Sequence, residues 1–137
     1  MKYNFQFEND KINITSPNDE NINFDLKSTI QLKPFYFDGQ LIIKNKKIEH
    51  IIDYLLINAL NYNKEYIGNF NGNLKIKFND LRNKIIKNGQ IKFLINENNL
   101  VLYDVNFMLD KIGEVNSSIT VKEDLGVIKF FSNNKLT

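Results

Sequence analysis

Apolar and polar residues alternate along most of this chain. Between residues 22 and 32, five of the six even positions are apolar and none of the odd positions is. A period of two indicates a half-buried strand with one apolar and one wet face. Shorter alternating runs predict strands at 2–8 and 11–15, joined by a tight turn at Asn9-Asp10. After the long strand, Pro34 limits ladder pairing and predicts a sheet edge or a bend.

The dipeptide Asp38-Gly39 separates two further apolar runs, at 35–37 and 40–43. Two interpretations stay open for it: a hairpin turn between two strands, or a bulge within one long strand.

From Gly72 the alternation returns and continues toward the C-terminus. Its strands carry their apolar residues at Leu74-Ile76-Phe78, Ile91-Phe93-Ile95, Val101-Tyr103-Val105-Phe107-Leu109, Val115-Ser117-Ile119-Val121 and Ile128-Phe130-Ser132. Within each group the residues are expected to share one face. Every linker here is short, which favours antiparallel neighbours in a meander.

One segment has a different period. The spacing of Ile48, Ile51, Ile52, Leu55, Leu56 and Ala59 fits an amphipathic helix over about 46–60, with Asn45 as its N-cap. The whole pattern predicts a single β-rich domain over 1–137. It is mainly β: an antiparallel β-meander sheet, curved or groove-forming, with this one helix inserted.

The predicted sheet has more apolar surface than the predicted helix covers. Eight or so strands about 4.8 Å apart make a sheet roughly 35–40 Å wide. A helix of this size is about 22 Å long and about 10 Å across. The uncovered apolar side chains must therefore curl into a barrel, pack on another domain or line an apolar groove.

Composition limits the chemistry that is available. Hydrophobic residues make up 42% of the chain and charged residues 25%, which is typical of a globular protein. The 23 Asn, 19 Ile and 17 Lys share AT-rich codons, so we attribute their abundance to coding bias. The lack of Cys excludes disulfides and thiolate metal sites, and a single His excludes a multi-His site. A net charge of +2 is too small to require a polyanionic partner.

No catalytic constellation is evident. His50 stands beside Glu49 and Asp53, which fits either a general base or, as we favour, a solvated helix residue. The acidic pairs Asp19-Glu20 and Glu123-Asp124 lack the spacing of a calcium loop. The run Lys75-Ile76-Lys77-Phe78 sets Phe on the opposite face from Lys, unlike a nucleic-acid platform. We therefore expect no enzyme activity, no cofactor or metal, and no nucleic-acid partner.

Residues 70–89, FNGNLKIKFNDLRNKIIKNG, and the closing strand GVIKFF at 126–131 resemble the AsmA-like family of envelope proteins. The order of a long strand, a short helix and these strands resembles that family over roughly residues 22–132. The resemblance implies a bridge of repeating β-sheet units whose groove faces lipid acyl chains. It also implies an inner-membrane anchor, a periplasmic location, and a role in phospholipid transport or outer-membrane assembly. Its implied partners are lipid acyl chains, with other envelope proteins or further repeats of the same chain. The family brings no catalytic residues.

The chain lacks the N-terminal anchor of the family and is far shorter than a full member, so we expect a fragment of a longer protein. The residues expected to line a lipid groove are Leu74, Ile76, Phe78, Ile91, Phe93, Ile95, Val105, Phe107, Ile119 and Phe130. Ordinary core packing is an equal interpretation for each of them. Two alternatives stay open for the whole chain: a closed β-barrel that binds a small apolar ligand, and a structural interaction module.

Overall fold

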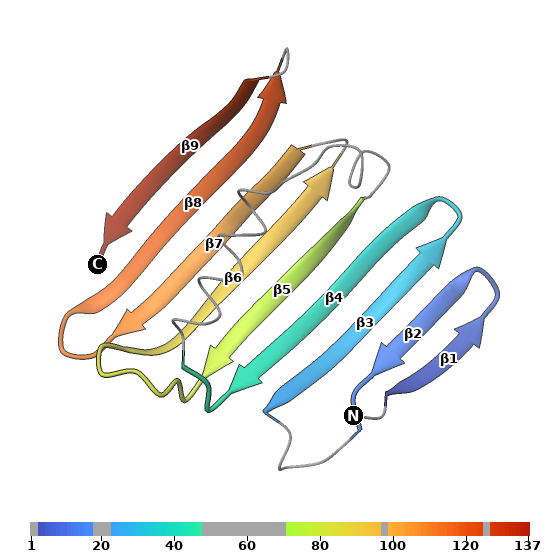
Figure 1. The fold of residues 1–137 in the computed structure, drawn as a ribbon, viewed down its shortest axis with the longest axis horizontal. Helices are drawn as coiled ribbons and strands as arrows, with labels where there is room; N and C mark the ends of the chain where they lie inside the picture. The colour runs from blue at the N-terminus through green and yellow to red at the C-terminus, as the bar shows by residue number, and fades with distance from the viewer. Residues whose placement is uncertain (1–2, 18–22, 48–70, 97–98, 125–126) are drawn as a thin grey trace.

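The protein is built around one β-sheet. The computed structural model describes the backbone of residues 3–17, 23–47, 71–96, 99–124 and 127–137, and the side chains of all of these except residues 119 and 121–135. The strands are β1 Asn4–Glu8, β2 Lys11–Thr15, β3 Phe24–Leu32, β4 Phe35–Lys44, β5 Gly72–Asn79, β6 Ile86–Asn96, β7 Asn99–Leu109, β8 Gly113–Asp124 and β9 Val127–Leu136. Their order in the sheet follows their order in the chain, from β1 to β9 (Figure 1). The predicted mainly β fold is confirmed.

Two hairpins form the N-terminal part of the sheet. Asn9-Asp10 joins β1 to β2, as predicted, with Asn9 at a φ of 50°, a conformation that Asn tolerates. Lys33-Pro34, linked by a cis peptide bond, joins β3 to β4 and pairs Leu32 with Phe35. The predicted bend at Pro34 is therefore confirmed, and Pro34 lies outside the ladder, where its missing N–H removes no interstrand bond.

Asp38-Gly39 forms neither a hairpin turn nor a bulge. It lies in the middle of β4, where Asp38 pairs with Thr29 and Gly39 pairs with Ser28 without any shift of register. The turn is made four residues earlier, at Pro34, so the chain has no need to reverse again here.

The sheet departs from the predicted antiparallel meander at one step, because β4 and β5 pair in parallel. At one end of this pair the amide of Arg82 donates to the carbonyl of Lys46, and at the other the amide of Phe37 donates to the carbonyl of Asn71. Parallel neighbours need a connection of a dozen or more residues. The sequence offers that length between residues 45 and 71, which the meander prediction did not take into account.

The helix predicted over 46–60 falls almost entirely outside the described residues. Its first two positions, Lys46 and Lys47, are described and are not helical. Asn45, the predicted N-cap, lies at a bend with a φ of 54°. No helix occurs in the part of the chain that the structure describes.

A bulge between β6 and β7 changes which side chains of β7 share a face. The register shifts between Gln90 and Lys92, opposite Asp104, which has a φ of 52°. An extra residue on one strand reverses the alternation beyond it. The prediction that Val101 and Tyr103 share a face with Val105, Phe107 and Leu109 is therefore wrong. Leu100 and Leu102 take that face instead, because they pair with Ile95 and Phe93.

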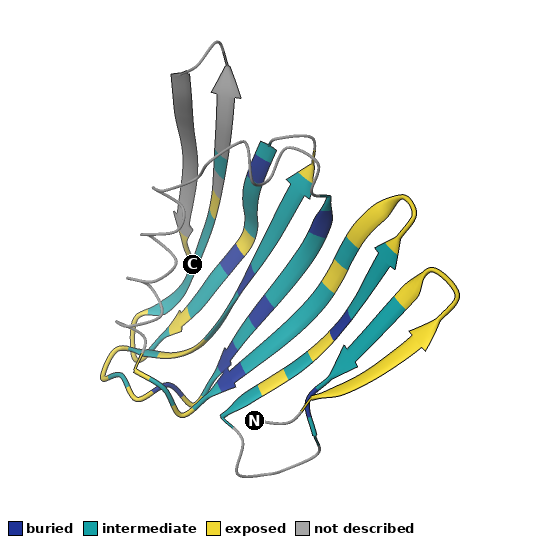
Figure 2. Ribbon diagram, turned by 45° about the vertical axis from the view of Figure 1, so that its right-hand side comes forward, coloured by how far each residue is buried: buried dark blue, intermediate teal, exposed yellow. Residues whose placement is uncertain are grey.

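The sheet is open, with β1 and β9 as its two edges, so the closed-barrel alternative is wrong. Burial is concentrated in the central strands, where dark blue segments gather in Figure 2, while β1 and the hairpin tips are exposed. The buried cluster consists of Ile43, Ile76, Phe78, Leu81, Ile91 and Val105. Leu81 comes from the loop after β5 and packs against these strand residues, held by a bond from its amide to the carbonyl of Lys87.

Candidate functional site

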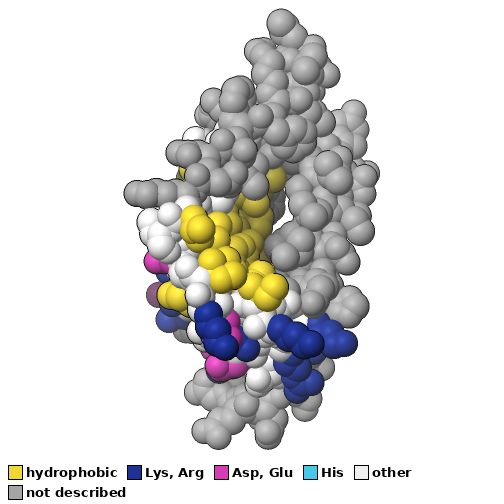
Figure 3. All heavy atoms as spheres, turned by 90° about the vertical axis from the view of Figure 1, so that its left-hand side faces the viewer, with side chains coloured by type: hydrophobic (Ala, Val, Ile, Leu, Met, Phe, Trp, Pro, Cys, Tyr) yellow, Lys and Arg dark blue, Asp and Glu magenta, His cyan; other side chains and the backbone are white. Residues whose placement is uncertain are grey.

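One face of the sheet is apolar on every strand whose side chains are described. Directly paired residues of neighbouring strands point to the same side, so the register identifies the members of this face. We call it the apolar face: Phe5, Phe7, Ile12, Ile14, Phe24, Leu26, Ile30, Leu32, Phe35, Phe37, Leu41, Ile43, Leu74, Ile76, Phe78, Ile86, Ile91, Phe93, Ile95, Leu100, Leu102, Val105, Phe107, Leu109 and Val115. In the side view of Figure 3, hydrophobic side chains gather in one strip with Lys and Arg side chains at its lower end.

The centre of the apolar face is a packed core. Phe78 is only 1% exposed, and its ring stacks on that of Phe107 with 6.0 Å between the centroids. Gly89 makes this packing possible, because a Cβ there would lie 2.4 Å from Cδ1 of Phe107. Each large apolar side chain that is fully buried contributes roughly 1.5–3 kcal/mol to stability. At these positions the core interpretation is the better one.

Beside this core the apolar face contains a hollow of about 280 Å³, lined by Phe37, Gly72, Asn73, Leu74, Phe93 and Ile95. Gly72 pairs with Phe37 on β4 and with Ile95 on β6, so no side chain stands between those two residues. No other residue fits, since a Cβ at this position would come within 2.4 Å of the carbonyl oxygen of Phe37. The hollow is therefore a consequence of backbone packing and is lined almost entirely by hydrocarbon.

Toward β1 the apolar face becomes exposed. Phe5 is 59% exposed and Phe7 is 73% exposed, and Leu32 and Phe35 at the β3–β4 hairpin are also exposed. We call these four residues the exposed rim. Contiguous exposed apolar side chains are a feature of interaction surfaces and lipid sites.

Ser28 places a polar group on the apolar face. Ser28 is 5% exposed, lies opposite Ile14 and Gly39, and its hydroxyl has no hydrogen-bond partner. A buried hydroxyl without a partner is unfavourable by about 1–3 kcal/mol. Gly39 removes one side chain beside it, and the ring of Phe37 occupies that space.

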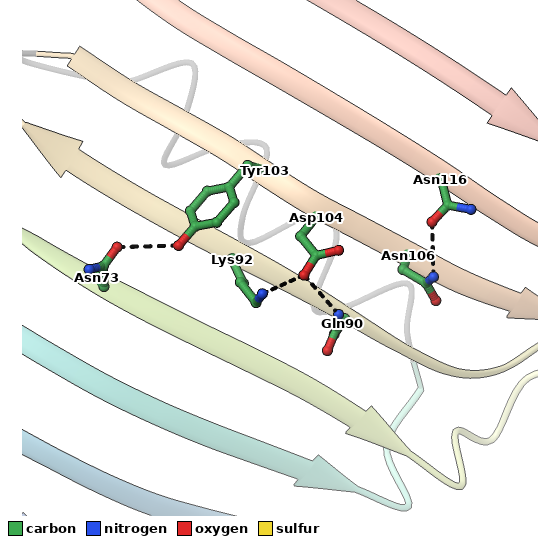
Figure 4. Close-up of polar contacts among 7 residues, drawn as sticks. All are labelled: Asn73, Gln90, Lys92, Tyr103, Asp104, Asn106 and Asn116. Atoms are coloured by element: carbon green, nitrogen blue, oxygen red, sulfur yellow. Dashed lines mark hydrogen bonds and ion pairs between the residues drawn. The ribbon is translucent and has the colours of Figure 1, made fainter.

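The opposite face of the sheet is polar and hydrogen-bonded across strands (Figure 4). Asn73 donates to the hydroxyl of Tyr36 and accepts from that of Tyr103, and Asn106 donates to Asn116 at 2.9 Å. These bonds tie β4, β5, β7 and β8 together without involving the apolar face. A shallow polar hollow of about 590 Å³ lies over β1–β4 and has the larger volume; in its lining the hydroxyl of Ser16 donates to Oδ1 of Asp25 at 2.6 Å.

The ion pair on this polar face is formed at the β7 bulge. Lys92 Nζ lies 2.5 Å from Oδ2 of Asp104, and Gln90 donates to the same oxygen at 3.1 Å. The hydrogen bond to Asp104, assisted by the negative charge of that carboxylate, raises the pKa of Lys92 above its ordinary value of 10.5. Both side chains are solvated, so this arrangement is a cross-strand contact and offers no reactive group.

The structure separates the predicted groove residues into three sets. Ile76, Phe78, Ile91 and Val105 are buried in the core, and Phe107 packs against it. Leu74, Phe93 and Ile95 line the hollow. Ile119 and Phe130 pair through their backbones with Leu102 and Val121, while their side chains lie outside the described residues. Sequence reasoning missed Phe37 and Gly72, and the Gly in an otherwise alternating strand was the available signal for a close backbone approach.

Within the described ranges, no group of three or more His, Asp or Glu side chains is placed to hold a metal ion. His50, Glu49, Asp53 and the pair Asp19-Glu20 lie outside those ranges, as do the side chains of Glu123-Asp124. The same part of the chain contains no helix with the length and apolar character needed to cross a membrane.

Comparison with known proteins gives no family for this chain. No protein-family model, no curated protein and no solved structure matches it. The assignment of its function therefore depends on the apolar face, the hollow and the resemblance stated above.

Proposed function

We propose that this protein is a non-enzymatic cell-envelope protein of AsmA-like type whose apolar face contacts lipid acyl chains, in phospholipid transport or outer-membrane assembly. The observation that carries this proposal is the hollow of about 280 Å³ between Phe37, Gly72, Leu74, Phe93 and Ile95. Ligand sites are commonly about 300–1,000 Å³, and this hollow lies just below that range, so its size suits a segment of one acyl chain and not a whole lipid. A hydrocarbon chain needs no polar partner, which suits a lining with almost no polar surface.

The exposed rim supports the same proposal. Phe37 of the hollow pairs with Ile30, which pairs with Ile12, which in turn pairs with the exposed Phe7. An apolar path therefore runs from the hollow to the edge of the sheet. A lipid chain lying along this path removes aromatic and aliphatic surface from water, and burial of such surface is favourable by about 25 cal/mol per Å².

The location and the partners in this proposal come from the sequence resemblance. They are a periplasmic location, an inner-membrane anchor in the full-length protein, and other envelope proteins or further repeats of the same chain as partners. The polar face, with its cross-strand bonds from Asn73 and Asn106, is suited to contact with water on the other side of the sheet.

A matched pair of substitutions tests the proposal. Leu74→Phe, on β5, fills the hollow. Leu94→Phe makes the same change on the polar face of β6, in the residue pair next to that of Leu74 and Phe93. Delipidated protein is mixed with vesicles that contain a fluorescent phospholipid, and the lipid bound per chain is measured after separation. We expect near-stoichiometric uptake by the wild type and by Leu94→Phe, and at least a tenfold lower uptake by Leu74→Phe. Circular dichroism checks that both variants remain folded.

Two results would count against the proposal. Equal uptake by both variants would mean that lipid binds away from the hollow. A wild-type chain that takes up no lipid while showing a sharp unfolding transition would mean that the apolar face is core alone. A second substitution, Phe93→Asp, separates these roles further. If Phe93 is a groove residue, the variant loses lipid binding and stays folded. If Phe93 is a core residue, the variant unfolds.

A further inference from the structure

Strand β1 is an edge that is open to pairing. Within the described residues it pairs with β2 only, and it carries the two most exposed aromatic side chains of the apolar face, Phe5 and Phe7. Edges are commonly protected by Lys, Pro or a bulge. The segment Asn4–Glu8 contains neither Lys nor Pro, and its register with β2 has no bulge.

The register determines which backbone groups of β1 face outward. The amide of Leu32 donates to the carbonyl of Asp10, and the amide of Ser16 donates to the carbonyl of Leu26, so the even residues of β2 bond toward β3. The odd residues of β2 therefore bond toward β1, where they pair with Asn4, Gln6 and Glu8. The N–H and C=O groups of Phe5 and Phe7 consequently point away from the sheet.

The geometry points to a second copy of this chain as the partner of that edge, bound antiparallel to β1 about a two-fold axis through Gln6. In this register Phe5 of one copy pairs with Phe7 of the other, and each pair exchanges backbone bonds through the groups that point outward. Asn4 pairs with Glu8, and Gln6 pairs with its own equivalent. An isologous contact of this kind closes on itself as a dimer.

The side chains fit the same arrangement. Residues that pair directly share a face, so the four Phe rings meet on one side and the apolar faces of both sheets become continuous. Asn4, Gln6 and Glu8 meet on the polar side. The two Glu8 carboxylates are offset by four residues, about 14 Å at 3.4 Å per residue, which exceeds the screening length of about 8–10 Å at moderate salt. No like charges face each other.

The area indicates a dissociable dimer. Phe5 and Phe7 are 59% and 73% exposed, and a buried aromatic side chain covers about 150–250 Å², so the four rings supply on the order of 500 Å². The paired backbones add to this, which gives a contact near or below the lower limit of stable interfaces, about 1,200 Å². The monomer–dimer equilibrium should therefore depend on concentration. This contact does not require lipid binding.

Single Cys substitutions test the register, because the wild-type chain has no Cys. Facing residues of a non-hydrogen-bonded pair have Cα atoms about 4.5 Å apart, within disulfide range. Gln6→Cys should therefore form a disulfide-linked dimer under mild oxidation. Glu8→Cys is the matched control, because it is also exposed on β1 yet its equivalent lies about 14 Å away. We expect at least tenfold more linked dimer from Gln6→Cys on a non-reducing gel.

Sedimentation and the crosslinking comparison decide the matter. Sedimentation of the wild type should show a reversible dimer, and Phe7→Lys should raise its dissociation constant at least tenfold. Equal crosslinking of both Cys variants would overturn the register. A wild type that stays monomeric up to its solubility limit, or that forms open filaments through β1 and β9, would overturn the two-fold dimer.

Discussion

Phe78 at the centre of the sheet and Phe7 at its edge occupy equivalent positions in the sequence pattern, yet their surroundings differ completely. Both lie on the apolar face in alternating strands, but Phe78 is 1% exposed and Phe7 is 73% exposed. The difference comes from neighbours: β5 has a strand on each side and the Leu81 loop above it, whereas β1 pairs only with β2 in the described structure. Alternation therefore decides which face a side chain joins, and position in the strand order decides how deeply it is buried.

Truncating these two rings should give the largest contrast. Phe78→Ala removes a fully buried ring and should lower the free energy of unfolding by about 3–5 kcal/mol. Phe7→Ala removes an exposed ring and should change it by no more than about 0.5 kcal/mol. Urea unfolding followed by circular dichroism measures both, at a protein concentration where the chain is monomeric. Similar losses for the two variants would mean that burial at the edge equals burial at the centre.

Substitutions of two glycines on the apolar face should also differ in their effect on the free energy of unfolding, by a smaller amount. In Gly72→Ala the new Cβ would meet the carbonyl oxygen of Phe37 at 2.4 Å, and backbone there cannot move without breaking the β4–β5 ladder. We expect a loss of about 1–3 kcal/mol. In Gly39→Ala the nearest atoms belong to the side-chain ring of Phe37, at 2.7 Å, and that ring can rotate toward the exposed end of the sheet. Unfolding in urea should therefore show a smaller loss for Gly39→Ala, and the reverse order would contradict this account.

Local alternation was enough to predict most of the sheet. The strands at β1, β2, β3, β5 and β8 and the turn at Asn9-Asp10 depend on contacts between residues that are close in sequence. Leu74, Phe93 and Ile95 were correctly placed on one face by the same rule.

Features that depend on a partner strand were missed. The parallel step from β4 to β5 depends on a long-range pairing, which alternation within either strand does not encode. The bulge at Asp104 looks like continued alternation in the sequence, because Val101 and Tyr103 are apolar enough for either face. To predict the hollow, one must know that Gly72 lies between Phe37 and Ile95 in the sheet. These three residues are far apart in the sequence.

A substitution at Ser28 is expected to increase stability, unlike those above. Its hydroxyl is buried on the apolar face without a partner, so Ser28→Ala should raise the free energy of unfolding, by about 1 kcal/mol. The neighbouring Thr29 lies on the polar face and donates to Asn13 at 2.8 Å, so Thr29→Ala should lower it by up to about 1 kcal/mol. Thermal unfolding of the two variants compares the faces directly at adjacent positions. A loss of stability in Ser28→Ala would mean that the hydroxyl is satisfied in the folded protein.

The smallest effect is expected on the polar face, at Lys92 and Asp104. Because Asp104 raises the pKa of Lys92 in the folded chain, the pair stabilises the fold fully below the unfolded value of 10.5 and loses this contribution as the pH rises through the folded pKa. Asp104→Asn removes the charge while keeping a residue that tolerates the φ of 52° at the bulge. The urea midpoint of each protein is measured at pH 7 and again above pH 11. The decrease between the two pH values should be larger for the wild type than for Asp104→Asn. The two proteins differ only at position 104, so the difference between their two decreases measures the contribution of this pair. Equal falls would show that the solvated ion pair adds nothing to the stability that the apolar face provides.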